Sequence, residues 1–400
     1  MDLHRPTFSK FGFFLLGFFL LGLNFVACGD VLISRPSTSD ITLQGEYLGT
    51  NLTNGKILGA QVSARGQGTF RLLLLDGGLP GQGWDGAGRK IMSGTLQGDK
   101  VVFSQLGYHL SIDNNGDSLI GTNDALQNLK LIKMVRKSPT QGQLPPTGSI
   151  TLFDGTSVQA WFRASIDSSG AMRSEGLGVD SGATTKQSFR NFLIHLEFQL
   201  PFEPTQSGTS RANSGIYLQK RYEIQILDSF GESQLDMTPL ETKQHCGAIW
   251  EQWAPRINMT FPPLSWQTLD IEFLAARYDT LGKKIDSGRV TVLHNGITIH
   301  DQRPFLDRTV AGDFEGPNPG PMRLQAYGHT VLFKNIWILE RSSVTPLRPF
   351  NHPNSTSKKR NLIPGRSNTF ISLPSTKLNG EYESITPDGR KWPTNPFSDK

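Results

Sequence analysis

Short segments in which apolar and polar residues alternate recur along most of this chain, and no long interior stretch shows the 3.6-residue period of a helix. The first group of segments runs from Ile41 to Val135 and is interrupted by Gly-rich turns. Its segments read ITLQGEYLG, ILGAQVSA, TFRLLLLDGG, KIMSGTLQG, KVVFSQL, YHLSIDNNGD and NLKLIKMV. This spacing predicts a small antiparallel β domain over residues 41–136.

A second group of segments begins at SITLFDG and ends near VLFKNIWILER, which places a second domain at residues 149–341. Its segments include FLIHLEFQL, SGIYLQ, YEIQILD, WQTLDIEFLAARYD, RVTVLHNGITIH, MRLQAYG and VLFKNIWIL. A long series of such strands predicts a two-sheet sandwich or jelly roll. The Pro and Gly residues of KSPTQGQLPPTG predict an interdomain linker at 137–148.

The N-terminus has the pattern of a secretory signal, because basic residues precede a long apolar stretch. This stretch ends in FVACG, which resembles a bacterial lipobox, although Phe25 stands where Leu, Val or Ile is usual. We expect residues 1–28 to be a signal whose Cys28 carries lipid, and 29–40 to be a polar linker. An uncleaved membrane helix is the alternative, since the apolar stretch is near the short limit for spanning a bilayer. The expected product is an exported, membrane-anchored lipoprotein of the cell envelope.

The chain has only two cysteines, Cys28 and Cys246. If Cys28 carries lipid, Cys246 has no disulfide partner, and we expect it to be a small buried residue. A bridge between the two cysteines is the alternative reading.

The net charge of +5 belongs to the C-terminal tail. Residues 342–400 hold nine Lys and Arg and four Asp and Glu, so the 40 basic and 35 acidic residues of the whole chain leave 31 of each sign before the tail. The tail is rich in Pro, and we expect it to be mostly disordered. A basic tail can also bind nucleic acid or an anionic surface. The charge gives no reason to expect a nucleic-acid partner for the two domains.

Several common catalytic and binding motifs do not fit this sequence. GQGWDG at 81–86 matches a dinucleotide-binding pattern, but a strand-like segment follows where that motif needs a helix, so we interpret these glycines as turn residues. The sequence contains no G-x-S-x-G, no H-E-x-x-H and no cysteine cluster for zinc. No cofactor and no metal site is expected, although carboxylates such as Asp228 and Asp279 leave a divalent cation open.

One stretch combines strand alternation with an unusual polar face. RANSGIYLQKRYEIQILDS, residues 211–229, predicts two strands joined by a tight turn. One alternating register of the second strand is apolar, whereas the other continues through both strands with Tyr217, Gln219, Arg221, Glu223 and Gln225. Periodicity alone leaves open whether this is a solvated face or the floor of a groove.

Tryptophans near polar residues favour the groove. Trp250, Trp253 and Trp266 lie in GAIWEQWAPRINMTFPPLSWQTLDIEF, among Asn, Gln, Arg and Glu. Aromatic rings beside fixed polar groups are typical of sugar-binding sites, because the ring stacks on the sugar and the polar groups bind its hydroxyls. Placement of these rings in the core is the alternative.

Five segments resemble the 3-keto-disaccharide hydrolase family: LFDGTSVQAW, ANSGIYLQKRYEIQILDS, CGAIW, PPLSWQTLDIEFLAARYDTLGK and GPMRLQAYGHTVLFKNIWI. The resemblance covers roughly residues 149–341. It implies an all-β fold, a concanavalin-like jelly-roll sandwich of two antiparallel sheets, here preceded by a smaller antiparallel β domain. It also implies cleavage of 3-keto-glycosides or 3-keto-disaccharides by removal of the C2 proton, elimination and rehydration.

The resemblance also implies roles for individual residues. Glu223 is the candidate acid or base, and Asp228 is a second candidate carboxylate whose alternative role is to cap a turn. Substrate contacts are expected for Arg211, Asn213, Tyr217, Gln219, Gln225, His245 and Trp266. Within this set Arg211 is the candidate for stabilising an oxyanion, and His245 is expected at the rim of the site.

The sequence departs from the family pattern at Lys220, where Gly is usual, and at Ala326 and Tyr327, where acidic and His residues are usual. These departures keep a non-catalytic carbohydrate-binding lipoprotein of the same fold as the alternative to the hydrolase. A retaining glycosidase is least favoured, because it needs a second carboxylate near Glu223 and the next residue on that face is Gln225.

Overall fold

The computed structural model describes residues 38–84, 86–113 and 115–341. The expected signal, the lipidation site at Cys28 and the basic tail therefore lie outside the described residues. The described chain is nearly all β, with two short α-helices, α1 (Thr38–Leu43) and α2 (Pro239–Thr242). None of the helices within these ranges is long and apolar enough to cross a membrane. The all-β class predicted from the alternation is confirmed.

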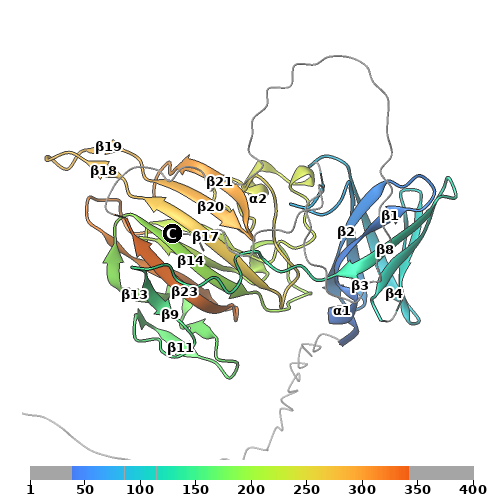
Figure 1. Ribbon diagram of the computed structural model, residues 1–400, viewed down its shortest axis with the longest axis horizontal. Coiled ribbons are helices and arrows are strands. Elements are labelled where there is room, and N and C mark those ends of the chain that lie inside the picture. Colours follow the sequence, from blue (N-terminus) through green and yellow to red (C-terminus); the bar gives the residue numbers. More distant parts are fainter. Residues whose placement is uncertain (1–37, 85, 114, 342–400) are drawn as a thin grey trace, which may run out of the picture. The chain divides into compact units, whose positions relative to one another are not determined.

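The first eight strands form a closed antiparallel barrel, because β1 pairs with both β2 and β8. Figure 1 shows this barrel in blue and cyan. The strands are β1 (Gly45–Asn51), β2 (Ile57–Gly66), β3 (Thr69–Asp76), β4 (Arg89–Gln97), β5 (Lys100–Gln105), β6 (Tyr108–Ile112), β7 (Ser118–Asn123) and β8 (Asn128–Met134). The glycines of 81–86 fall in the turn region between β3 and β4, so the rejection of a nucleotide-binding loop is consistent with the fold.

The second half of the described chain is a sandwich of two antiparallel sheets. A five-stranded sheet has the order β10 (Trp161–Phe162), β13 (Leu177–Phe189), β22 (Gly320–Tyr327), β15 (Ser214–Leu218) and β16 (Tyr222–Ile226). An eight-stranded sheet has the order β11 (Ala164–Ile166), β12 (Met172–Ser174), β23 (Leu332–Glu340), β14 (Phe192–Gln199), β17 (Trp266–Leu274), β20 (Arg289–His294) and β21 (Ile297–Pro304), and β9 (Ile150–Phe153) also pairs with β23. β18 (Arg277–Tyr278) and β19 (Lys284–Asp286) form a separate hairpin.

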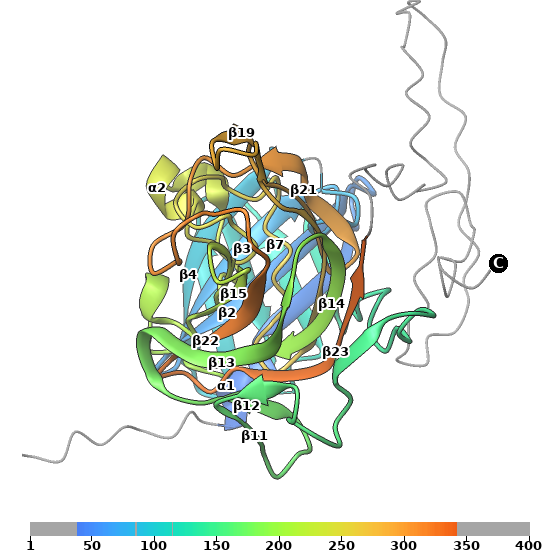
Figure 2. The same ribbon diagram turned by 90° about the vertical axis from the view of Figure 1, so that its left-hand side faces the viewer.

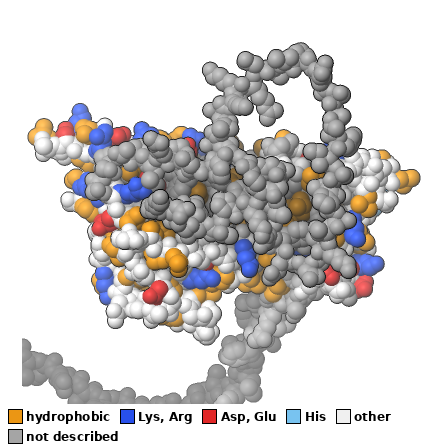
Figure 3. Space-filling view, in the orientation of Figure 1, with side chains coloured by type: hydrophobic (Ala, Val, Ile, Leu, Met, Phe, Trp, Pro, Cys, Tyr) orange, Lys and Arg blue, Asp and Glu red, His pale blue; other side chains and the backbone are white. Residues whose placement is uncertain are grey.

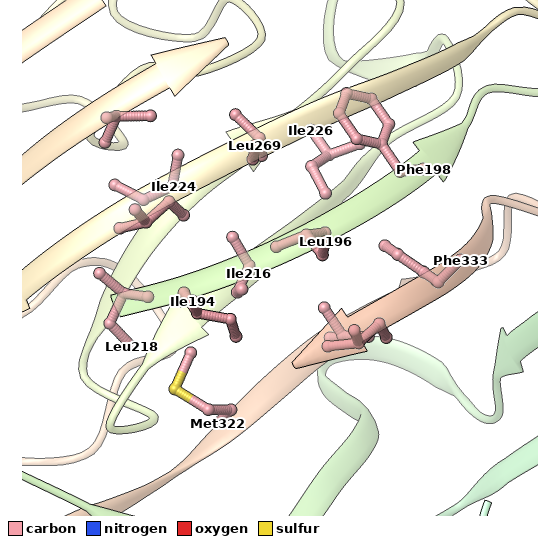
Figure 4. Packing of buried hydrophobic residues seen from close by; sticks show 14 of the residues in the cluster. Ile194, Leu196, Phe198, Ile216, Leu218, Ile224, Ile226, Leu269, Met322 and Phe333 are labelled. Atoms are coloured by element: carbon pink, nitrogen blue, oxygen red, sulfur yellow. The ribbon is translucent and has the colours of Figure 1, made fainter. Parts of the chain in front are cut away.

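The core of the sandwich comes from one face of each sheet. In β14 the alternate residues Ile194, Leu196 and Phe198 are buried in it, and in β16 so are Ile224 and Ile226. Figure 4 shows side chains of both sheets filling the same layer. Because side chains alternate along a strand, each sheet turns its other face away from this core. On both sheets that outer face is rich in polar residues.

The segment at 137–148 is docked rather than a plain polar connector. Ser138 and Thr140 are buried, and the Thr140 hydroxyl donates to Asp270 Oδ2 at 2.7 Å. The backbone N–H of Gly142 donates to Glu197 Oε1 at 2.6 Å. Both acceptors belong to the outer face of the eight-stranded sheet, so we name residues 138–143 the strap. Pro and Gly in the sequence indicate a turn-rich segment but do not show what it packs on.

Charges are mixed on the surface of the described residues. The face drawn in Figure 3 carries acidic and basic side chains among apolar ones. This agrees with the balance of 31 basic and 31 acidic residues before the C-terminal tail, taken from the sequence totals of 40 and 35 less nine and four.

Candidate functional site

The hairpin of β15 and β16 places the polar residues of 211–229 on one face. Tyr217 lies opposite Glu223, and Gly215 lies opposite Gln225. The turn between the strands is closed by the bond from Arg221 N–H to the Leu218 carbonyl at 3.0 Å. Both turn residues, Gln219 and Lys220, have φ of 53°, a conformation in which Gly is least strained. This geometry favours Gly at both turn positions, although neither residue is Gly in this chain.

The neighbouring strands extend this outer face into rows of side chains. β22 pairs with β15 so that Arg323 lies beside Tyr217, and β13 pairs with β22. Figure 2 shows β13 and β22 running next to each other. The first row holds Glu223, Tyr217, Arg323 and Thr184, and the second holds Gln225, Gly215, Gln325 and Gly182. These eight residues come from four strands that lie between residues 177 and 327 of the chain, yet they form one surface.

Glu223 is the most perturbed carboxyl of this face. It is 3% exposed, and the Tyr217 hydroxyl donates to its Oε2 at 2.8 Å. Burial raises the pKa of Glu223 to about 8, although the Tyr217 hydrogen bond and the charge of Arg323 act in the opposite direction. A carboxyl that changes protonation near neutral pH can accept or donate a proton in catalysis.

Gly215 provides the space that the Glu223 carboxyl occupies. A Cβ atom at this position would lie 2.2 Å from Glu223 Oε1, closer than any real contact. The glycine in SGIYL is therefore required by the Glu223 side chain, which reaches it diagonally across the strand pair, because the backbone of Gly215 itself is ordinary strand. The sequence shows the glycine but does not show that its neighbour is the carboxyl.

Arg323 is a site residue that the sequence reasoning missed. It is 2% exposed, its guanidinium carbon lies 3.9 Å from the centre of the Tyr217 ring, and its Nη2 donates to the Ala311 carbonyl at 2.9 Å. The alternation of GPMRLQAY contained the signal, since Arg323 and Gln325 share a register opposite to Met322 and Leu324. The arrangement places a cation and a phenol hydroxyl beside the Glu223 carboxyl.

A loop segment covers this group and was also not anticipated. The backbone N–H of Glu223 donates to Thr309 Oγ1 at 2.9 Å, and the Tyr217 hydroxyl lies 3.1 Å from the Val310 carbonyl oxygen. With the bond from Arg323 to Ala311, residues 309–311 contact the side chains of Tyr217 and Arg323 and the backbone of Glu223. We name 309–311 the cover. Its sequence has no alternation that would place it over a sheet.

Asn213 and Gln225 join Glu223 on the same face. The Gln225 and Asn213 side-chain amides lie 3.1 Å apart, and both residues are buried. Gln219 is held further along the hairpin, where its Nε2 donates to the Phe189 carbonyl at 2.8 Å and its Oε1 accepts from Arg221 at 2.8 Å. Its amide is thus bound to the protein at both ends.

Arg211 and Asp228 form a buried ion pair with each other, with 2.6 Å between Arg211 Nε and Asp228 Oδ2. Burial raises the pKa of Asp228, and the charge of Arg211 opposes that rise. Asp228 Oδ1 also accepts from the Phe230 N–H at 3.1 Å, which is the turn-capping role that the sequence left as its alternative. The structure therefore gives both residues a structural partner.

His245 and Trp266 are placed apart from this group. His245 Nε2 lies 2.9 Å from Met237 Sδ, and burial lowers the pKa of His245 to about 4. Trp266 begins β17 in the eight-stranded sheet, whereas Glu223 is in the five-stranded sheet. Cys246 is buried, and burial raises its thiol pKa to about 12, which agrees with the interpretation as a small core residue.

Among the described residues, no group of three or more His, Cys, Asp or Glu is arranged to hold a metal ion. The groups that the geometry brings together at this face are Glu223, Tyr217 and Arg323 with the neighbouring amides.

Comparisons with known proteins add to this geometry. Residues 148–339 match the family model of the 3-keto-alpha-glucoside-1,2-lyase-like domain. A solved protein from Parabacteroides distasonis, provisionally described as a glycosyl hydrolase, is 31% identical over 49% of this chain and 85% of its own, with a TM-score of 0.43. A second protein from that organism with the same description is 20% identical over 52% of this chain and 98% of its own, with a TM-score of 0.35. No curated protein matches the sequence.

Proposed function

Because this chain belongs to the family of 3-keto-alpha-glucoside-1,2-lyase-like domains, we propose that it is a carbohydrate-active hydrolase that cleaves glycosides of 3-keto sugars. The observation that carries the proposal is Glu223, a buried carboxyl whose pKa of about 8 suits it to take a proton from carbon. The relative that is 31% identical supports the broader class of glycosyl hydrolase.

The proposed reaction starts at C2 of the sugar. A ketone at C3 acidifies the C2 proton, and the Glu223 carboxylate removes it while the electron pair moves onto the ketone oxygen as an enolate. The enolate then re-forms the ketone and expels the C1 substituent, which leaves with the proton that Glu223 took from C2, so a C1–C2 double bond remains. Water adds its oxygen to C1 and a proton returns to C2. The sum is hydrolysis, with no covalent enzyme intermediate.

Arg323 and Tyr217 are the proposed stabilisers of the enolate. Enzymes lower such barriers mainly by placing fixed hydrogen-bond donors and charges where negative charge develops. Arg323 supplies a cation that is held by its bond to Ala311. Burial raises the pKa of Tyr217, so its hydroxyl keeps its proton and serves as a donor. We propose Arg323 for the oxyanion role that the sequence reasoning gave to Arg211, because Arg211 is engaged with Asp228.

A substrate reaches Glu223 only if the cover moves, because the carboxyl is 3% exposed and the cover contacts the residues around it. The proposed cycle therefore includes an open form in which residues 309–311 leave the outer face of β15, β16 and β22. Closure would then exclude water from the enolate, which strengthens the electrostatic contribution of Arg323.

The test is release of a chromophore from a 3-keto-glucoside by the purified chain and by Glu223→Gln. We expect the variant to lose about 100-fold or more in kcat/KM, the usual contribution of a general base. Glu340→Gln removes an exposed carboxyl of β23 and serves as the matched control. Release by Glu223→Gln at the rate of the wild type would contradict the role of Glu223.

A non-catalytic binding protein is the second candidate, and the departures from the family pattern favour it. Ala326 and Tyr327 end β22, the strand that carries Arg323, and Tyr327 is 41% exposed. The same assay separates the two candidates. Saturable binding of the 3-keto-glucoside with no release by the wild type would establish the binding function and overturn the hydrolase.

We also propose that the protein is exported and anchored to the membrane through a lipid on Cys28, on the basis of the apolar N-terminal stretch and FVACG alone. A Cys28→Ala variant is expected to leave the membrane fraction. Continued partitioning of that variant with membranes would contradict the proposal of a lipid anchor on Cys28.

A further inference from the structure

The outer face of the eight-stranded sheet contains a cavity that the proposed reaction does not use. Its volume is about 260 Å³. The residues that line it are Ser169, Gly170, Ala171, Gln199, Trp266 and Lys334. We name it the Trp266 cavity. Glu223 is on the outer face of the other sheet, so the core of the sandwich separates the two places.

Three adjacent strands and one turn build this cavity. Gln199 of β14 pairs with Trp266 of β17, and Lys334 belongs to β23 on the other side of β14. Figure 1 shows β14, β17 and β23 together in the same sheet. The turn at 167–170 closes the cavity, and Asp167 Oδ1 fixes it by accepting from the Ser169 N–H at 2.9 Å and the Ala171 N–H at 3.1 Å. The walls are therefore formed before any ligand binds.

The side chains in the cavity are those that recognise a sugar ring. Trp266 is partly exposed and offers an aromatic surface, while Gln199 and Ser169 offer an amide and a hydroxyl. The Gln199 Nε2 donates to the Leu264 carbonyl at 2.8 Å, which fixes the orientation of the amide. An aromatic ring and an oriented amide are both present, and the Lys334 ammonium, which lies over the ring, moves aside when a sugar stacks there.

The charges of the cavity indicate a neutral ligand. Lys334 Nζ lies 4.1 Å from the centre of the Trp266 ring, and it lies 3.5 Å from Oε2 of the buried Glu197. The lysine is thus already neutralised by a carboxylate, so an acidic sugar finds no unpaired cation in this group. The volume lies below the roughly 300 to 1,000 Å³ of pockets for drug-sized ligands, which favours a single ring.

We propose that the Trp266 cavity is a second carbohydrate-binding site that takes one neutral pyranose residue of a glycan chain. The sugar lies between the turn at 167–170 and the Trp266 ring, and the rest of the glycan extends into solvent. This site binds without cleaving, and it is separate from the site around Glu223. Its role is to hold the protein on a glycan while the other face acts on a smaller ligand.

Titration with neutral and acidic oligosaccharides tests the proposal, with heteronuclear NMR or calorimetry as the readout. Cellotriose and maltotriose represent the neutral class, and trigalacturonate represents the acidic class. We expect the wild type to bind a neutral trisaccharide and Trp266→Ala to bind it about tenfold more weakly, since an aromatic stack contributes about 1.4 kcal/mol. Trp266→Phe, which keeps a ring, should recover most of the affinity and guards against a folding defect.

Phe162→Ala is the matched control, because it removes an exposed aromatic ring from the other sheet and should leave binding unchanged. No binding of either neutral trisaccharide, equal binding by Trp266→Ala, or preference for trigalacturonate would each overturn the proposal. These results do not depend on the proposed hydrolysis, because none of the ligands is a 3-keto sugar.

Competition tests whether the two sites are separate. A neutral trisaccharide at saturating concentration should leave release from the 3-keto-glucoside unchanged, and Glu223→Gln should bind the trisaccharide as the wild type does. Competitive inhibition of release would place both ligands in one site and overturn the proposal of a distinct site.

Discussion

At the scale of single residues, Glu223 is held in a state that costs stability. An isolated glutamate ionises near pH 4.5, whereas burial raises the pKa of Glu223 to about 8. Between these two values the unfolded chain binds fewer protons than the folded chain, so stability falls as pH rises through this range. The side chain is tolerated because the Tyr217 hydroxyl donates to it and Gly215 leaves it room. Such a cost is common at catalytic sites.

Two pH dependences follow for Glu223. Release from the 3-keto-glucoside should rise with pH through about 8, because only the carboxylate can remove the C2 proton. Glu223→Gln should unfold at a higher temperature than the wild type at pH 9 and at nearly the same temperature at pH 4, where the glutamate is protonated in both states. Profiles of kcat/KM and of Tm against pH measure the two effects. A rate that is already maximal at pH 6 would show that the carboxyl has an ordinary pKa.

Sequence alternation placed Glu223 on a polar face with Tyr217, and the family resemblance gave Glu223 its expected role, but neither pointed to Arg323. In YEIQI the side chains alternate between the two faces of a strand, so Glu223 and Gln225 lie on one face and Ile224 on the other. This assignment can be made without knowing which strands are neighbours. Arg323 has the same kind of signal in β22, but the pairing of β22 with β15 joins segments 100 residues apart. Local pattern does not encode that pairing, and the family resemblance gave the oxyanion role to Arg211 instead.

At the scale of elements, the cover is the part most suited to move. It lies in a segment without regular structure between β21 and β22, and backbone contacts bind this segment to the turn that precedes β16. Thr309 N–H donates to the Arg221 carbonyl at 2.9 Å, and Asp313 N–H donates to the Lys220 carbonyl at 2.7 Å. A Cβ atom on Gly312 would stand 2.3 Å from the Arg221 carbonyl oxygen, so this approach requires a glycine.

Gly312→Ala should therefore lift the cover from β16. We expect a loss of about 1–3 kcal/mol in stability, as for other overpacked contacts. Partial exposure should lower the pKa of Glu223 toward 4.5, and the rise of kcat/KM should move to lower pH. Gly316→Ala is the control, because its Cβ would meet only Arg221 Nη2 at 3.8 Å. Hydrogen exchange at 309–311 and the pH profile of kcat/KM report the change. Faster exchange with an unchanged pH profile would show that the cover does not control the pKa of Glu223.

At the scale of the whole described chain, the strap binds the segment after the barrel to the sandwich. It does so through a buried cluster formed by His195 and the carboxylates Glu197 and Asp270. His195 Nδ1 lies 2.6 Å from Asp270 Oδ1, and Glu197 and Asp270 also accept from the strap. The Trp337 ring stacks on His195, with 5.3 Å between ring centres. The alternation of FLIHLEFQL predicts the face on which His195 lies. It cannot predict that a segment more than 50 residues earlier covers that face.

This cluster makes stability depend on pH in a second way. Burial alone would lower the pKa of His195, but the hydrogen bonds and charges of Asp270 and Glu197 outweigh it and raise the pKa to about 9. The imidazolium therefore contributes its full stabilisation below pH 6.5, and this is lost as pH rises through 9. Lys334, which is 3.5 Å from Glu197, is the other charged group at the cluster.

His195→Gln tests this contribution, best in a Glu223→Gln background, since Glu223 also changes stability between pH 4.5 and 8. The added substitution should lower Tm more at pH 6 than at pH 10, because the imidazolium is lost from the parent protein at the higher pH. Hydrogen exchange of the strap should speed up in the parent between pH 7 and pH 10, after correction for the intrinsic rate, and should show less pH dependence in the variant. An equal drop in Tm at both pH values would mean that His195 acts by packing against Trp337 and not by its charge.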